Sequence, residues 1–141
     1  MSHIDQQAEF MKACDQRVNR TTPTYNEDML LWKRLIDEEY EEFDDEMWKL
    51  HNLVELGTVI DFDNVEQREV YDGVIKEILD LHYVVMGFLN VIGINPNNGA
   101  DLLHYNNMTK VGDNGKVEKT SYGKVLKPEG YQPLDVSILH D

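Results

Sequence analysis

The chain has 141 residues, of which 27 are acidic and 13 basic, and its formal net charge is −14 at pH 7. A surface this acidic repels nucleic acid and anionic membranes, which argues against both as partners and favours cations. A single cysteine excludes a disulfide framework. The polar start of the chain and the absence of any run of roughly 18 apolar residues lead us to expect a cytoplasmic protein.

The first predicted helix covers residues 4–20. Phe10, Cys14 and Val18 recur there at helical spacing. We expect this helix to stop before Thr21-Thr22-Pro23, because proline restricts the residue that precedes it.

A long second helix is predicted over about residues 27–50. Asn26 stands directly before Glu27 and Asp28, an order typical of an N-cap followed by acidic residues in the first turn. Residues 51–65 then lose the helical period, which favours a connecting loop.

The strongest helical signal in the chain covers residues 66–92. Gly93 suits the left-handed cap that often ends a helix. Asn95-Pro96 indicates the N-cap and first turn of a fourth helix to about residue 107. From Lys110 onward, glycines, lysines and turn residues favour a hairpin or an extended tail.

We therefore expect one all-α domain spanning residues 1–141. Its helical core would cover about residues 4–107, and a lysine-rich tail would cover about residues 108–141. A chain of this length buries only part of its surface and often completes its core in an oligomer.

Eight carboxylates crowd into the ten residues 37–46. At 100° per residue, with Leu35 at zero, the apolar side chains of this helix span an arc from about −40° to about 140°. Glu39 and Glu42 fall inside that arc. A solvated acidic face accounts for the carboxylates that point outward, but not for these two.

The helix over residues 66–92 repeats this pattern, with Glu77 inside its apolar arc and Asp80 at the edge. The opposite, exposed face is expected to hold Asp72, Lys76, Tyr83 and Asn90. An ionised carboxylate on a core face costs several kcal/mol unless it is paired, hydrogen-bonded or bound to metal. Two inward pairs at i and i+3 therefore predict a metal site, and all-oxygen ligands favour Mg²⁺ or Mn²⁺ over zinc.

These residues resemble a known family. Glu38-Glu39-Tyr40-Glu41-Glu42 followed by Glu77-Ile78-Leu79-Asp80 is similar to the EExxE and ExxD signature of the all-α NTP pyrophosphohydrolases. This MazG-like superfamily also contains dimeric dUTPases and phosphoribosyl-ATP pyrophosphohydrolases. The tail NNMTKVGDNGKVEKTSYGKVLKPEGYQPLD is similar to the SNMSK…GKVLK…PPDL endings of a bacterial and phage subgroup, so the resemblance covers about residues 27–139.

The resemblance implies a helical bundle completed by homodimerisation, or by assembly into a tetramer. It implies hydrolysis of a nucleoside triphosphate, such as a dNTP or a non-canonical nucleotide, to a monophosphate and pyrophosphate. The implied Mg²⁺ ligands are Glu39, Glu42, Glu77 and Asp80. Glu38 would act beside Glu39 as a catalytic residue that orients or deprotonates water.

By motif position, Asn107, Lys110 and Lys124 would contact the substrate. The chain departs from the family pattern at Asn106 and Thr109, which replace serines. It also has a longer segment between the two acidic motifs, and it lacks the glycine that usually follows GKVLK. Two alternatives stay open, namely a phosphoribosyl-ATP pyrophosphohydrolase and a catalytically silent helical dimer that binds a nucleotide or a protein.

Overall fold

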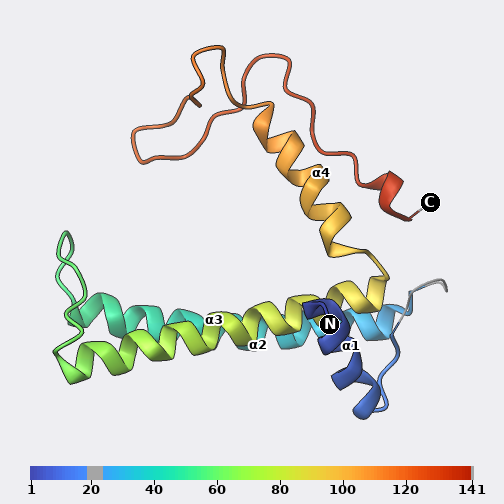
Figure 1. Cartoon of the computed structure of the whole chain (residues 1–141), viewed down its shortest axis with the longest axis horizontal. Coiled ribbons are helices and arrows are strands. Elements are labelled where there is room, and N and C mark those ends of the chain that lie inside the picture. The colour runs from blue at the N-terminus through green and yellow to red at the C-terminus, as the bar shows by residue number, and fades with distance from the viewer. Residues whose placement is uncertain (19–23, 141) are drawn as a thin grey trace. The chain divides into compact units, whose positions relative to one another are not determined.

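The computed structural model describes residues 1–18 and 24–140. Within these residues the chain is helical and contains no strand, apart from one isolated bridge between Lys119 and Val125. The all-α class predicted from the sequence is thus confirmed. The elements in chain order (Figure 1) are α1 His3–Ala13, α2 Asn26–Leu53, α3 Val65–Ile92, α4 Pro96–Met108 and the 3-10 turn η1 Ser137–His140.

The chain divides into two compact units, Met1–Gly93 and Ile94–Asp141. The first contains α1, α2 and α3, and the second contains α4 and the tail. The sequence placed the fourth helix in the helical core, whereas its contacts place α4 with the tail. Whether the two units act as one domain stays a prediction.

The helices α2 and α3 form an antiparallel hairpin and lie side by side (Figure 1). Two glycines of α3 show how they are aligned. A Cβ added at Gly87 would overlap the Trp32 ring, and a Cβ at Gly73 would lie 2.6 Å from the Glu46 carboxylate. In both contacts, 32 with 87 and 46 with 73, the residue numbers add up to 119. Residues of α2 and α3 that obey this sum lie at the same level of the hairpin.

The buried core lies at one end of the hairpin, where α1 packs against α3. Met11 of α1, Trp32 of α2 and Val91 of α3 are buried and pack together. The core is small, because few other apolar side chains of this unit are fully buried.

Asn90 is fully buried, contrary to the sequence-based prediction that it lies on an exposed face. Its side-chain amide donates hydrogen bonds to the carbonyl of Ile4 and to Oε1 of Gln7. Both acceptors belong to α1. The prediction was wrong because it considered α3 alone, and α1 covers this side of α3 with polar groups that an amide can satisfy.

The first helix is shorter than predicted, because α1 ends at Ala13. Cys14 caps it and Asp15 adopts a left-handed φ of 55°, which stops helical propagation. The last predicted helical residues, 19–20, and the expected stop at Thr21-Thr22-Pro23 lie outside the described residues.

The start of α2 also differs from the prediction. Asn26 is the first residue of the helix and not its cap, and the N-cap Tyr25 makes no side-chain capping hydrogen bond. At its other end α2 continues to Leu53, so the connecting loop spans residues 54–64 and is shorter than the predicted 51–65.

The ends of α3 and the start of α4 agree with the prediction. Gly93 ends α3 with a left-handed φ of 74°, and Asn95 caps α4 by accepting a hydrogen bond from the Asn97 amide.

Within the described part of the chain, no single helix is long and apolar enough to cross a membrane. Taken together as a broken span, α3 and α4 are long and apolar enough, on length and composition alone.

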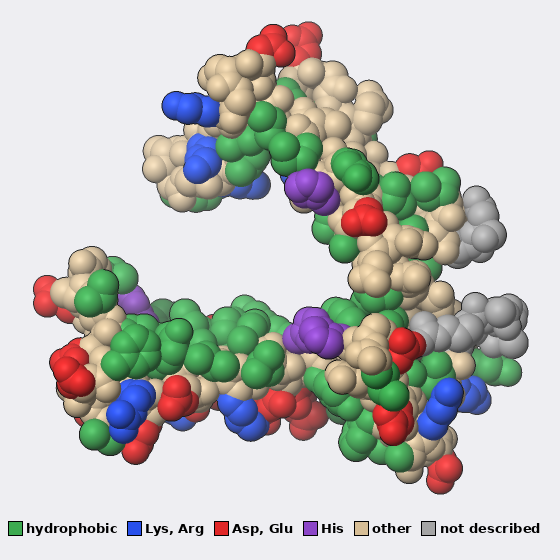
Figure 2. All heavy atoms as spheres, in the orientation of Figure 1, with side chains coloured by type: hydrophobic (Ala, Val, Ile, Leu, Met, Phe, Trp, Pro, Cys, Tyr) green, Lys and Arg blue, Asp and Glu red, His purple; other side chains and the backbone are tan. Residues whose placement is uncertain are grey.

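The hairpin leaves apolar surface uncovered. Figure 2 shows hydrophobic side chains gathered along α2 and α3. Tyr40 and Trp48 of α2 and Leu79 of α3 are each more than half exposed, and Met47 and Ile78 are about two-fifths exposed. The apolar arcs predicted from the sequence are therefore wider than one neighbouring helix can cover.

Candidate metal centre

The four carboxylates predicted as metal ligands lie on facing turns of α2 and α3. Spacing of i and i+3 puts Glu39 and Glu42 on one face of α2, and it does the same for Glu77 and Asp80 on α3. Glu42 lies at the level of Glu77, and Glu39 lies at the level of Asp80, because the residue numbers of each pair add up to 119. The glycine contacts that align the helices thus also bring the two acidic motifs opposite one another.

Glu39, Glu42 and Glu77 converge on one point. Each offers one carboxylate oxygen, and these oxygens all lie within 4.8 Å of one another. At an effective dielectric constant of about 20, such a distance implies a repulsion of roughly 3 kcal/mol for each ionised pair. The cluster is therefore strained in the absence of a cation.

Two oxygens of the cluster are buried without a donor. Oε2 of Glu39 and Oε2 of Glu77 are shielded from solvent and find no hydrogen-bond partner among the described residues. Buried acceptors without partners are costly, and a divalent cation would satisfy them. Since the donor set consists of carboxylate oxygens alone, the residues fit a hard ion such as Mg²⁺ or Mn²⁺.

The electrostatics of the cluster act most strongly on Glu39. Burial raises the pKa of Glu39, and the charges of Glu42, Asp80 and Glu77 and a hydrogen bond with Glu42 raise it further. Asp80 is outside the convergent set of three, yet it lies close enough to influence Glu39.

In EDTA, the protein is expected to lose stability as the pH rises above 4.5, the ordinary pKa of a glutamate. Folded Glu39 holds its proton more tightly than the unfolded chain does, so this stabilisation is complete at low pH and is lost as the pH rises through the raised pKa. Glu39→Gln should remove this part of the pH dependence and raise the Tm of the metal-free protein at pH 7.

Thermal unfolding in EDTA between pH 4 and 8, followed by circular dichroism, measures this effect. Glu41→Gln is the matched control, because Glu41 is an exposed residue of the same helix. A Glu39→Gln variant that is less stable than the wild type at pH 7 in EDTA would contradict the expectation.

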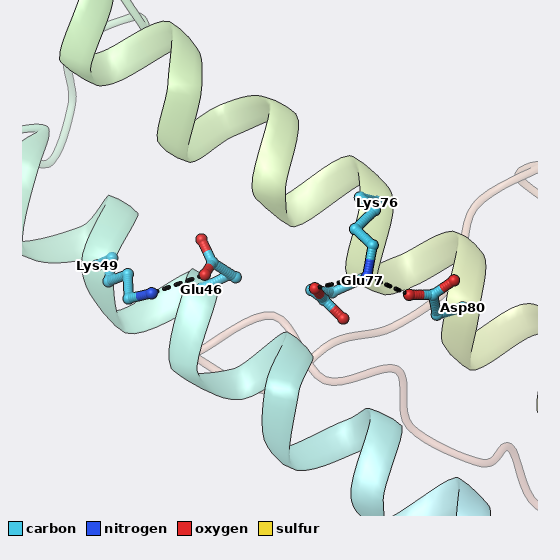
Figure 3. Close-up of polar contacts among 5 residues, drawn as sticks. All are labelled: Glu46, Lys49, Lys76, Glu77 and Asp80. Atoms are coloured by element: carbon cyan, nitrogen blue, oxygen red, sulfur yellow. Dashed lines mark hydrogen bonds and ion pairs between the residues drawn. The ribbon is translucent and has the colours of Figure 1, made fainter.

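Asp80 is engaged by a lysine. Nζ of Lys76 lies 2.7 Å from Oδ2 of Asp80 and 3.3 Å from Oε1 of Glu77 (Figure 3). The predicted exposure of Lys76 is confirmed, because its side chain is 67% exposed. Its contact with two predicted ligands was missed, although a lysine four residues before an aspartate is a recognised helical pair.

Glu46 is a further carboxylate between the two helices (Figure 3). Its side chain is 21% exposed, lies against Gly73 and pairs with Lys49 at 2.7 Å. The sequence did not assign Glu46 to the ligand set. The helical period does predict that Glu46 points inward, one turn beyond Glu42. Gly73 is a second signal, since an isolated glycine in a strongly helical pattern often has a packing reason.

The remaining predicted site residues lie as follows. Glu38 is exposed on α2 beside Glu39. In the second unit, Nζ of Lys110 donates a hydrogen bond to Oδ1 of Asn107 at 3.0 Å, so these two predicted substrate contacts are neighbours. Lys124 is exposed in a short turn of the tail. The roles of all four residues stay predictions.

Asn106 ties the tail to α4. Its amide nitrogen donates to the carbonyl of Gln132 at 2.9 Å, and its amide oxygen accepts from the Tyr131 hydroxyl at 2.7 Å. Nζ of Lys110 lies 5.5 Å from the centre of the same Tyr131 ring. An asparagine can make both hydrogen bonds at once, which gives Asn106 a structural role in the second unit.

No family model and no curated protein matches this chain. Its function is therefore inferred from the two acidic motifs, the geometry of the carboxylate cluster and the composition of the tail.

Proposed function

We propose that this protein hydrolyses a nucleoside triphosphate, such as a dNTP or a non-canonical nucleotide, to a nucleoside monophosphate and pyrophosphate with the aid of Mg²⁺. The observation that carries the proposal is the convergence of Glu39, Glu42 and Glu77, with two buried oxygens that have no donor. The resemblance to MazG-like pyrophosphohydrolases supports the choice of substrate class.

Charge makes a cation necessary for binding. A nucleoside triphosphate carries about four negative charges, and four carboxylates would repel it in the absence of divalent ions. We assign Glu39, Glu42, Glu77 and Asp80 as the residues that hold Mg²⁺ or Mn²⁺. The chemistry that such an ion supplies is neutralisation of phosphate charge and acidification of a water molecule.

Glu38 would accept the proton of the attacking water. The water oxygen forms a bond to the α-phosphorus, and the bond from that phosphorus to the oxygen shared with the β-phosphate breaks. The electron pair leaves with pyrophosphate, and the proton passes to the Glu38 carboxylate. Because Glu38 is exposed beside Glu39, it can exchange that proton with solvent after each turnover.

The tail would supply positive charge for the phosphates of the substrate. Lys110 and Asn107 are hydrogen-bonded neighbours, and we assign both, with Lys124, to contacts with the substrate. Lys110→Ala is expected to raise KM about tenfold with little change in kcat, because it removes binding shared by the ground and transition states. Steady-state kinetics with Lys119→Ala as the control tests this, and an unchanged KM would remove Lys110 from the binding role.

The apolar surface that α2 and α3 leave uncovered would be covered by a second copy of the chain. Tyr40, Trp48 and Leu79 are large apolar side chains of these helices that are more than half exposed, and burial of what remains exposed on each would contribute about 1–2 kcal/mol. Sedimentation velocity distinguishes a dimer from a tetramer. A well-folded monomer at micromolar concentration would contradict this arrangement.

Product analysis tests the reaction itself. The protein is incubated with Mg²⁺ and a panel of canonical and modified NTPs and dNTPs, and the products are separated by ion-exchange chromatography. Monophosphate with pyrophosphate, lost in EDTA, is the expected result. Turnover of phosphoribosyl-ATP alone would move the assignment to that enzyme class. Nucleotide binding without turnover would favour the alternative of a catalytically silent binding protein.

A further inference from the structure

We propose that Lys76 is a resident counter-ion of the carboxylate cluster, which holds Asp80 when no divalent cation is bound and has to release it when one binds. In this role Lys76 is a positioning residue that weakens the affinity of the site for metal. The inference rests on the proposed metal-binding function, and it concerns a residue outside the predicted ligand set.

The four predicted ligands are not equivalent in the structure. Oxygens of Glu39, Glu42 and Glu77 converge, whereas Asp80 stands outside this group with Oδ2 only 2.7 Å from Nζ of Lys76. The contact with Lys76 holds the Asp80 carboxylate outside the convergent group and puts a positive charge beside it, so the lysine competes with a divalent cation for this carboxylate. Asp80 can complete the ligand set once this contact is broken.

Glu77 connects the lysine to the cluster. Its Oε1 lies 3.3 Å from Nζ of Lys76, while its Oε2 is buried without a partner (Figure 3). The side chain of Glu77 is 13% exposed, against 40% for Asp80 and 67% for Lys76. Lys76 thus contacts Glu77 from the more exposed side and leaves its buried oxygen without a partner.

Lys76 is well suited to an exchange. Its hydrogen bonds to Asp80 and Glu77 raise its pKa, so it is a cation throughout the neutral range. Its mostly exposed stem has four flexible carbons, and solvent-exposed ion pairs of this kind are weak. A divalent ion would therefore replace one positive charge by two at a low cost in lost contacts.

A matched lysine is present on α2. Lys33 pairs with Asp37 at the same i and i+4 spacing, and its side chain is 62% exposed. Neither residue belongs to the predicted ligand set. Lys33→Met therefore removes an equivalent surface ion pair and the same net charge without touching the cluster.

The test is titration of the nucleotide-free, full-length protein with Mn²⁺, with the free ion measured by electron paramagnetic resonance. Lys76→Met is expected to lower the Kd for Mn²⁺ about three- to tenfold, because a competing positive charge is removed from two ligands. Lys33→Met should stay within about twofold of the wild type, because Lys33 pairs with Asp37, which is outside the ligand set, and its exposed charge is screened. Lys76→Arg, which keeps the charge, should restore a Kd near that of the wild type.

A double-mutant cycle with Asp80→Asn separates displacement from a general effect of charge. If Lys76 acts by occupying Asp80, the gain from Lys76→Met disappears in the Asp80→Asn background. The same gain in both backgrounds would overturn the proposed displacement. An unchanged or higher Kd in a folded Lys76→Met single variant would also overturn it.

Failure of the underlying function has a different signature. A wild-type protein that binds no Mn²⁺ would refute the metal centre and this inference together. A wild type that binds Mn²⁺ and does not respond to Lys76→Met refutes the inference alone. Circular dichroism and the Tm in EDTA confirm that each variant is folded.

Discussion

Glu77→Gln is expected to abolish Mg²⁺-dependent release of pyrophosphate, with kcat/KM lowered by at least about a thousandfold. The side chain of Glu77 is 13% exposed, against 40% for Asp80, and its Oε2 is buried without a hydrogen-bond partner. An amide at this position replaces a charged ligand oxygen by a neutral group and can turn an N–H toward Glu39 or Glu42. Binding of Mn²⁺ should weaken in parallel with the loss of activity.

The same substitution should leave the fold intact. Because it removes one negative charge from a repulsive cluster, the Tm of Glu77→Gln in EDTA should equal or exceed that of the wild type. Glu69→Gln is the control, since Glu69 is an exposed residue of the same helix. Activity of Glu77→Gln above about a tenth of the wild-type value would exclude Glu77 as an essential ligand.

Gly87→Ala is expected to destabilise the protein by about 2–4 kcal/mol, the largest effect on stability that we predict for a single added methyl group. The new Cβ would overlap the ring of Trp32, which is 4% exposed and packs against Met11 and Val91. A large ring held on several sides cannot move aside. Urea denaturation with an unchanged m-value measures the loss.

Gly73→Ala provides a contrasting variant on the same helix. Its Cβ would meet the end of the flexible Glu46 side chain, which can move away. Alanine also favours a helix over glycine by about 1 kcal/mol, so this variant should be close to neutral. A Gly87→Ala protein as stable as Gly73→Ala would contradict the packing of Trp32 against α3.

The sequence predicted the two long helices well, and the acidic pairs in part. The apolar period of α2 and α3 gives the direction of the side chains on them, and Glu39, Glu42 and Glu77 do converge, but Glu42 is exposed and Asp80 lies outside the convergent group. The caps at Gly93 and Asn95 were predictable for a similar reason, because they depend on local backbone chemistry alone.

Features that depend on contacts between elements, or on how far a side chain reaches, were not predictable from periodicity. The burial of Asn90 requires α1, whose position no pattern within α3 can reveal. The contact of Lys76 with Asp80 was missed because an outward direction was taken to mean solvation, although a long side chain can fold back over its own helix. The alignment of α2 with α3 needs a contact between them, and Gly73 and Gly87 show its position only once the partner side chains are known.

The two glycine contacts make the positions of the predicted ligands independent of the length of the loop at the hairpin tip. Both acidic motifs lie between the contacts of Gly87 with Trp32 and of Gly73 with Glu46, whereas loop 54–64 lies beyond the second contact. A change in the length of this loop would therefore fall at the hairpin tip, beyond both contacts. This tip is a natural site for grafting an epitope or a reporter domain, because the added mass would leave the facing turns of the helices where they are.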